Sequence, residues 1–288
     1  MVLFGLGMTV INGHAVTTSP PRPKAKYRGR RPPAQGECSG LMHKDSGVAD
    51  ELETICSVPN LTVKRYRMRR SMELKDVKSG PNESLLIPFG GTVEVTIRPG
   101  GERFRLNQKD VCYLPPKTDF SATADGPAEL IWAAAPAERS FPAYVKRFSE
   151  QKVIASGAPS YKRRIVTAIG EDDPANRFIV GFVEGEPGNW TSFPPHRHDG
   201  KPEVYIYYGM GKKFGVQLVS AEEERAFVVR DGDAVAFERG YHPNVATPTV
   251  GINFLWIIST DPKARNLSVD VHPEYRDAPM GQTHLTVR

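Results

Sequence analysis

Short runs of β-branched and aromatic residues, each followed by turn-forming residues, fill the chain from Leu61 onward and constrain its fold more than any other feature. The 288 residues include 26 Gly and 25 Pro, enough to separate many short elements by turns. No helix-length amphipathic segment interrupts the runs, and only residues 142–152 are predicted to form a short linker helix. Many short strands without βαβ alternation favour an all-β fold of sandwiches or jelly rolls.

The predicted strands form two series, one on each side of this linker. The first series covers residues 61–68, 84–88, 92–98, 102–106, 110–114 and 129–133, and the second covers 163–169, 177–184, 203–208, 214–220, 226–230, 234–237 and 252–258. The segments starting at Lys109 and at Asp231 both place an acidic turn before a short apolar strand, which indicates an internal duplication. We therefore expect an N-terminal lobe at 56–150 and a C-terminal lobe at 151–288, preceded by a mobile Pro- and Arg-rich arm at 1–55.

The positive charge of the chain is concentrated in this arm. Six cations and no acid lie between Ser19 and Gly36, and they exceed the net charge of +5 of the whole chain. The basicity therefore belongs to a local segment rather than to a folded face. The composition predicts a disordered, solvated arm, with an arm that binds nucleic acid or phosphate as the alternative. The six cations are Arg22, Lys24, Lys26, Arg28, Arg30 and Arg31.

The three cysteines, Cys38, Cys56 and Cys112, are far apart, odd in number and without CxxC spacing. They predict neither a disulfide framework nor a zinc finger, and a reducing, cytoplasmic compartment is the simpler interpretation. No apolar run approaches the roughly 20 residues of a membrane span. We therefore expect no membrane partner and no nucleic-acid partner for the folded part, and a homo-oligomer stays open.

A cluster of metal-ligating residue types lies in the second strand series. His196 and His198 are two apart in a segment expected to be extended, so both imidazoles point to the same side. Glu203 opens the next predicted strand, and His242 follows a later turn that a jelly roll can bring alongside. Three imidazoles and one carboxylate suit zinc, manganese, iron or nickel and leave positions for water or substrate oxygens. The pattern predicts one divalent metal bound by these four residues, and a surface histidine pair is the alternative.

This pattern resembles the cupins, whose first motif is HxH followed by a glutamate and whose second motif ends in a turn that delivers the last histidine. More narrowly, the second series is similar to the 5-deoxy-glucuronate isomerases of myo-inositol catabolism and to the related 5-keto-4-deoxyuronate isomerases of pectin breakdown. The phrases that carry this resemblance are Gly188-Asn-Trp-Thr, Pro194-Pro195-His-x-His, Arg230-Asp-Gly-Asp and Arg239-Gly-Tyr-His-Pro-Asn.

The sequence departs from the cupin pattern at two places and from the first isomerase group at one. Glu238 stands where many cupins have proline, and Gly240 is one residue closer to His242 than usual. The segment between His198 and Glu203 is short for the first isomerase group and closer to the second. Both deoxy-uronates therefore stay open as substrates.

The resemblance implies a bicupin with one divalent metal, Zn²⁺ or Mn²⁺, and Fe²⁺ as the less favoured ion. It implies an aldose–ketose isomerase for a small sugar acid, converting 5-deoxy-D-glucuronate to 2-deoxy-5-keto-D-gluconate. The alternatives are 5-keto-4-deoxyuronate isomerisation, a cupin dioxygenase and a non-catalytic sugar-binding bicupin. The first lobe has no histidine between Leu61 and Ser160, so we expect it to lack a metal.

Four further residues are predicted to contact substrate. Strand parity places Tyr205 and Tyr207 on the face of Glu203 and Asn244 on the face of His242, and Gln217 is a polar residue in an apolar strand. Core packing is the alternative for the tyrosines. The sequence does not identify the general base, and it offers several cations for the substrate carboxylate. These cations are Arg197, Lys201, Arg230 and Arg239, and Trp190 is expected to be structural.

Overall fold

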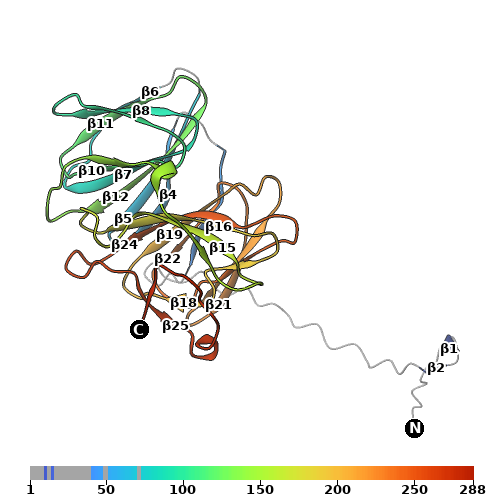
Figure 1. Cartoon of the computed structure of the whole chain (residues 1–288). Coiled ribbons are helices and arrows are strands. Elements are labelled where there is room, and N and C mark those ends of the chain that lie inside the picture. The colour runs from blue at the N-terminus through green and yellow to red at the C-terminus, as the bar shows by residue number, and fades with distance from the viewer. Residues whose placement is uncertain (1–9, 12–13, 16–39, 48–50, 70–72) are drawn as a thin grey trace, which may run out of the picture. The chain divides into compact units, whose positions relative to one another are not determined.

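The computed structural model describes residues 10–11, 14–15, 40–47, 51–69 and 73–288 (Figure 1). Met1–Glu37 and Cys38–Arg288 are separate units. In the first unit, β1 (Val10–Ile11) pairs with β2 (His14–Ala15) in antiparallel fashion. The six cations of the predicted arm lie outside the described residues. All further description concerns the second unit.

The described part of Cys38–Arg288 contains β-strands and two short 3₁₀ turns, η1 (Phe148–Glu150) and η2 (Pro273–Tyr275), and no α-helix. The prediction of an all-β chain is confirmed. No helix in this part is long and apolar enough to cross a membrane.

The predicted linker helix at 142–152 is wrong. The segment forms strand β13 (Tyr144–Lys146) followed by η1, because β13 pairs with the edge of a sheet through β10 (Val111–Leu114). The carboxylate of Asp110 then accepts hydrogen bonds from Phe148 N at 2.9 Å and from Arg147 Nη1 at 2.7 Å. The backbone of this segment is therefore satisfied by neighbouring groups rather than by a helix.

The first lobe consists of two antiparallel sheets. One has the order β13-β10-β7-β12-β5-β4 and the other the order β6-β11-β8-β9. Its remaining strands are β4 (Leu52–Val58), β5 (Leu61–Met68), β6 (Glu73–Val77), β7 (Asn82–Gly90), β8 (Val93–Arg98), β9 (Arg103–Leu106), β11 (Asp119–Thr123) and β12 (Ala128–Pro136). An apolar core that includes Leu86, Val95, Phe120 and Trp132 fills the space between the two sheets.

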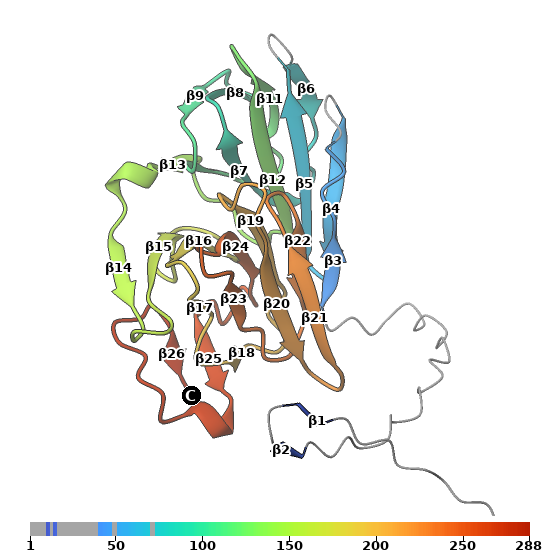
Figure 2. The same cartoon turned by 90° about the vertical axis from the view of Figure 1, so that its right-hand side faces the viewer.

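The second lobe has a large sheet of order β14-β15-β16-β24-β19-β22-β3 and smaller sheets of order β17-β23-β20-β21 and β18-β25-β26 (Figure 2). Its strands are β3 (Leu41–His43), β14 (Val153–Ser156), β15 (Arg163–Ile169), β16 (Phe178–Gly185), β17 (Trp190–Thr191), β18 (His196–Arg197), β19 (Glu203–Tyr208), β20 (Gly215–Ser220), β21 (Glu224–Val229), β22 (Ala234–Phe237), β23 (Asn244–Ala246), β24 (Asn253–Ser259), β25 (Ser268–Val271) and β26 (Thr286–Val287).

The large sheets of the two lobes share a third core. Strand alternation explains how one strand serves two cores: Val204 and Ile206 of β19 join the inter-lobe core, whereas Tyr205 and Tyr207 point into the second lobe. Polar contacts add to this interface. The buried carboxylate of Glu83 in the first lobe accepts hydrogen bonds from the backbone N–H groups of Asn176 and Arg177, both at 2.7 Å.

The expected arm at 1–55 is too long. Strand β3 pairs with β22 of the second lobe, and β4 begins at Leu52 and pairs with β5. Strand β3 is a three-residue edge strand, too short to show periodicity. Strand β4 contains a register shift between Thr54 and Cys56, which interrupts its alternation. Neither strand therefore shows a clear alternation of apolar residues in the sequence.

The order of the large sheets supports the internal duplication. In the first lobe, β7 lies between β10 and β12, and in the second lobe β19 lies between β22 and β24. Strands β10 and β22, which carry the shared sequence phrase, therefore occupy equivalent positions.

Candidate metal centre

The four predicted ligands come from three neighbouring stretches of the second lobe. His196 lies in β18, His198 follows that strand, Glu203 begins β19, and His242 follows the turn after β22. Because Phe237 of β22 pairs with Glu203 of β19, the chain that leaves β22 passes next to Glu203. The resulting cluster faces the interior of the lobe.

Each of the three histidines holds its Nδ1 against a backbone carbonyl. The distances are 3.0 Å for His196 to Pro194, 3.1 Å for His198 to Lys201 and 2.9 Å for His242 to Gly240. A carbonyl oxygen can only accept, so each Nδ1 carries a proton and donates it. In the neutral imidazole, Nε2 then has a free lone pair, as in metal-ligating histidines oriented by an outer hydrogen bond.

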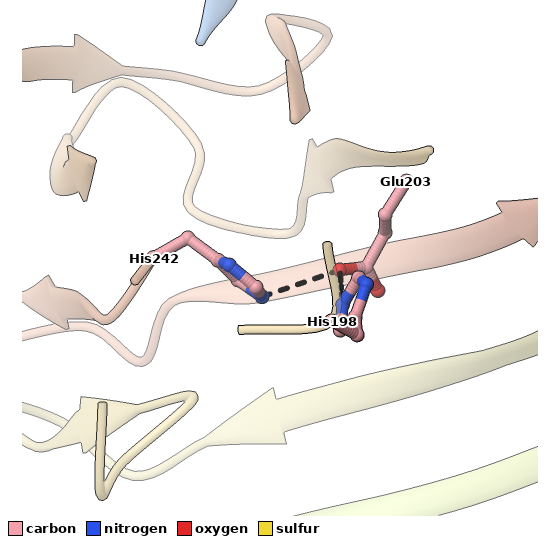
Figure 3. A group of neighbouring side chains, drawn as sticks. All are labelled: His198, Glu203 and His242. Atoms are coloured by element: carbon pink, nitrogen blue, oxygen red, sulfur yellow. Dashed lines mark hydrogen bonds and ion pairs between the residues drawn. The ribbon is translucent and has the colours of Figure 1, made fainter. Parts of the chain in front are cut away.

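The carboxylate of Glu203 lies between two of these rings (Figure 3). Its Oε2 is 2.9 Å from His198 Nε2 and 3.3 Å from His242 Nε2. One ligand atom from each of the three residues falls within 4.8 Å of the others. His196 is not part of this tight group, but its ring centroid is 5.1 Å from that of His242.

Burial and mutual charge set the protonation of the cluster. Glu203 is 3% exposed. Burial alone would raise its pKa, but His198 and His242 hold the pKa at about 2, so the group is a carboxylate. Burial and the neighbouring His242 lower the pKa of His196 well below 6.5, so this ring is neutral. For His198, burial is opposed by the nearby Glu203, which raises the pKa.

These residues fit a divalent metal ion. The donor set of neutral imidazoles and one carboxylate is suited to such an ion. His242 Nε2 is buried, and apart from the Glu203 carboxylate at 3.3 Å no described residue offers it a polar partner. A lone pair that faces a carboxylate needs a proton or a cation between them, and a metal ion bound at this point would satisfy His198, Glu203 and His242 together.

A cavity adjoins the cluster. Its wall includes His196, His198 and Glu203 together with Tyr205, and burial next to Glu203 raises the pKa of Tyr205 well above 10. The Tyr205 hydroxyl therefore stays protonated, and it lies 2.9 Å from Ser192 Oγ. Other lining residues are Arg163, Lys201, Trp256 and His284.

The remaining predicted substrate contacts lie outside this cavity. Tyr207 donates to Gln217 Oε1 at 2.7 Å, and Asn244 Nδ2 donates to the same oxygen at 3.0 Å. Gln217 Nε2 in turn donates to the His242 carbonyl at 2.8 Å. Tyr207, Gln217 and Asn244 therefore form a buried hydrogen-bonded network that also holds the His242 carbonyl. Their contact with substrate stays a prediction.

The predicted cations are largely occupied elsewhere. Lys201 lines the cavity, but its ammonium contacts Asn266 and Ser268 through four oxygen atoms at 2.7 to 3.0 Å. Arg197 lies 3.4 Å from Asp199, and Arg239 lies 3.0 Å from Glu222. Arg230 is exposed and lies over the Phe214 ring. Trp190 packs against Phe193, in agreement with a structural role.

Sequence reasoning missed most of the cavity wall, including Arg163, Trp256 and His284. Arg163 shares its strand face with Ile165, so a cation at the start of an apolar alternation was the available signal. Trp256 pairs with Tyr205 across β24 and β19, which the sequence does not show. His284 follows the last long strand and has no motif around it.

Comparison with known proteins agrees with this geometry. The sequence model of the KduI/IolB family matches residues 46–278. The chain is 33% identical over 148 residues to a 5-deoxy-glucuronate isomerase of Geobacillus kaustophilus, covering 47% of this chain and 54% of the relative. It is 27% identical over 172 residues to a 4-deoxy-L-threo-5-hexosulose-uronate ketol-isomerase of Opitutus terrae, covering 57% and 62%. The alignments thus span little more than half of these relatives.

Two solved structures have the same fold. An IolB-like protein from Salmonella typhimurium superimposes with a TM-score of 0.73 at 18% identity, covering 82% of this chain and 98% of that one. Oxalate decarboxylase from Bacillus subtilis, at 16% identity, gives a TM-score of 0.59 and coverage of 79% and 78%. The predicted bicupin fold is therefore confirmed.

Proposed function

Since the match over residues 46–278 shows that the chain belongs to the KduI/IolB family, we propose that it is a metal-dependent ketol isomerase of a deoxy-uronic acid. The substrate we favour is 5-deoxy-D-glucuronate, which would become 2-deoxy-5-keto-D-gluconate. The single observation that carries this proposal is the cluster of His198, Glu203 and His242 beside a cavity, in a chain whose relatives bear isomerase names.

We assign the metal to His196, His198, Glu203 and His242, and we favour Zn²⁺ or Mn²⁺. The hydrogen bonds at the three Nδ1 atoms support this assignment because they leave the Nε2 lone pairs free. His196 belongs to the set because burial keeps its ring neutral next to His242. Such an ion acts as a Lewis acid that makes the carbon next to a carbonyl more acidic.

The reaction moves protons without net oxidation. The C2 proton leaves, C1 gains a proton, and the hydroxyl proton passes from O2 to O1, so that the aldehyde becomes an alcohol and C2 becomes a ketone. The Tyr205 hydroxyl, which stays protonated, can donate to a substrate oxygen. His284 lines the cavity, and burial lowers its pKa to about 4, so that its neutral ring is a candidate proton carrier.

The second candidate substrate is 4-deoxy-L-threo-5-hexosulose-uronate. The Opitutus terrae relative named for this substrate is 27% identical over 172 residues, which is lower than the 33% over 148 residues of the Geobacillus kaustophilus 5-deoxy-glucuronate isomerase. The spacing of His198 and Glu203 favours this second candidate. Both candidates are deoxy-uronates with a carbonyl, so the proposed chemistry is the same.

The test is to load the purified protein with Mn²⁺ or Zn²⁺ and incubate it with each compound in D₂O. NMR would follow aldehyde–ketone interconversion and deuterium incorporation at carbon. We expect conversion of 5-deoxy-D-glucuronate and none by a His198→Ala variant. Turnover of the second compound alone would reassign the substrate. Failure to convert either compound with a full equivalent of metal bound would refute the isomerase and leave an oxygenase or a sugar-binding protein.

A further inference from the structure

Arg163 is a buried cation in the wall of the cavity beside the metal cluster. Arg163 is the first residue of β15 and is 4% exposed. Its Nη1 donates to the Tyr161 carbonyl at 3.1 Å. Within the described ranges, no carboxylate forms an ion pair with Arg163. The neighbouring Arg164 points to the opposite face of the strand, is exposed, and lies 3.4 Å from Glu184.

A buried guanidinium without an anionic partner destabilises the protein when no ligand occupies the cavity. Moving a charge out of water costs several kcal/mol unless a counter-ion compensates for the lost hydration. Burial lowers the pKa of Arg163 to about 10, which still leaves it a cation at neutral pH. The position therefore keeps a positive charge in the cavity without a counter-ion from any described residue.

The groups around Arg163 also have unused polar atoms. Trp256 and His284 stack with ring centroids 5.3 Å apart, and both line the same cavity. Trp256 Nε1 and His284 Nδ1 are buried, and neither has a hydrogen-bond partner in the part of the chain that the structure describes. A polar ligand in the cavity would satisfy these atoms, which an apolar ligand could not do.

We propose that Arg163 binds the carboxylate of the substrate and makes the site specific for a sugar acid over a neutral sugar. This inference rests on the proposed function, which places an acid in this cavity. A planar guanidinium donates two parallel hydrogen bonds to a carboxylate, a geometry that an ammonium cannot match. Lys201, the other cation of the wall, already contacts Asn266 and Ser268.

The experiment compares an acid with the corresponding neutral sugar, using the metal-loaded protein. D-glucuronate and D-glucose differ only in the group at C6, and binding would be measured by calorimetry and by intrinsic tryptophan fluorescence. We expect the wild type to prefer D-glucuronate by about tenfold or more. Arg163→Met should abolish this preference, and Arg163→Lys should retain part of it. Arg164→Met is the matched control and should leave the preference unchanged.

The melting temperature separates an anchoring role from a structural one. Removing an unpaired buried charge should leave the melting temperature of Arg163→Met unchanged or higher. A wild type without preference for the acid, or an Arg163→Met variant that keeps it, would overturn the inference. A folded variant that loses D-glucose and D-glucuronate binding equally would also overturn it. The proposed function fails separately, through absence of isomerisation in the wild type.

Discussion

The two lobes share the same strand pairing but differ in the chemical character of their interiors. In the first lobe, Ser84 of β7 pairs with Leu114 of β10 and Ala134 of β12. In the second lobe, Glu203 of β19 pairs with Phe237 of β22 and Ile258 of β24. Ser84 and Glu203 are therefore equivalent positions. Two residues further along each strand, Leu86 pairs with Trp132, and Tyr205 pairs with Trp256.

Trp132 and Trp256 occupy equivalent positions, but Trp132 lies in an apolar core and Trp256 lies in the wall of the candidate site. Trp132 Nε1 donates to Ser84 Oγ at 3.1 Å, so this indole N–H has its partner within the first lobe. Glu203 instead turns to His198 and His242, and Trp256 Nε1 has no partner among the described residues. The interior of the first lobe is thus mainly apolar. At the equivalent positions the second lobe has polar groups to which a ligand in the cavity can form hydrogen bonds.

The largest expected effect is the loss of the metal from the second lobe alone. His198→Ala should reduce bound Zn²⁺ or Mn²⁺ from one equivalent per chain to a small fraction of one, because it removes a donor from the tight group of three. Metal analysis after dialysis measures this loss. His43→Ala is the control, since His43 also lies next to a glutamate, at 3.1 Å from Glu53, but outside the cluster. A full equivalent in His198→Ala would refute the site.

The next effect tests whether the first lobe supports the second. Glu83 is fully buried and accepts hydrogen bonds from Asn176, Arg177 and Tyr113. Glu83→Gln replaces an acceptor oxygen by an amide nitrogen, so at least one donor loses its partner. We expect the free energy of unfolding to fall by about 3 kcal/mol, with the metal stoichiometry unchanged. Chemical denaturation and metal analysis measure the two quantities, and a simultaneous loss of metal would show that the lobes are not independent in function.

The fold and the cluster of candidate metal ligands were largely predictable from the sequence, for a physical reason. The alternation in β5 reflects burial on one face, and the largely apolar runs of β19 and β22 reflect burial on both faces. The HxH spacing fixes two imidazoles on one side of an extended chain. Both signals are local. The short strands, the role of Gln217 as a support for His242, and the position of Arg163 in the cavity depend on pairing between distant segments, for which a single sequence has no local signal.

The boundary of the second lobe gives the third prediction. Deleting residues 1–37 should leave the melting temperature unchanged, whereas deleting residues 1–47 should destabilise the protein by about 2 kcal/mol. The longer deletion removes β3 from the edge of the large sheet and removes Asp45, which lies 3.2 Å from the buried Arg65. Thermal unfolding of the two truncated chains measures the difference. Equal melting temperatures would show that β3 adds nothing to the lobe.

The stacked pair of Trp256 and His284 predicts a dependence on pH. Burial, together with the nearby positive charge of Arg163 and opposed by Glu203, lowers the pKa of His284 from 6.5 to about 4. The unfolded chain therefore binds more protons than the folded one between pH 6.5 and 4, and stability falls as the pH is lowered through this window. The full shift corresponds to ~3 kcal/mol, and the half-buried ring reduces our expectation to about 1 to 2 kcal/mol at pH 4.

The variant His284→Phe keeps the stacking on Trp256 and removes the titrating nitrogen. Its free energy of unfolding should fall less than that of the wild type between pH 6.5 and 4, and urea denaturation of the metal-free proteins measures the difference. Parallel pH profiles for the two proteins would show that His284 does not carry the effect.

The smallest effect addresses the equivalence of the two tryptophans directly. Trp132→Phe leaves the buried Ser84 hydroxyl without its donor, which should lower the free energy of unfolding by about 1 kcal/mol beyond the cost of the smaller ring. Trp256→Phe breaks no described hydrogen bond, so only the smaller ring should affect stability. It should instead weaken D-glucuronate binding, because Trp256 lines the ligand cavity and its buried Nε1 has no hydrogen-bond partner among the described residues. Denaturation and calorimetry on both variants measure these outcomes. If both variants lost the same stability and neither lost affinity, the second interior would be an ordinary core, and the contrast between the lobes would rest on the histidines alone.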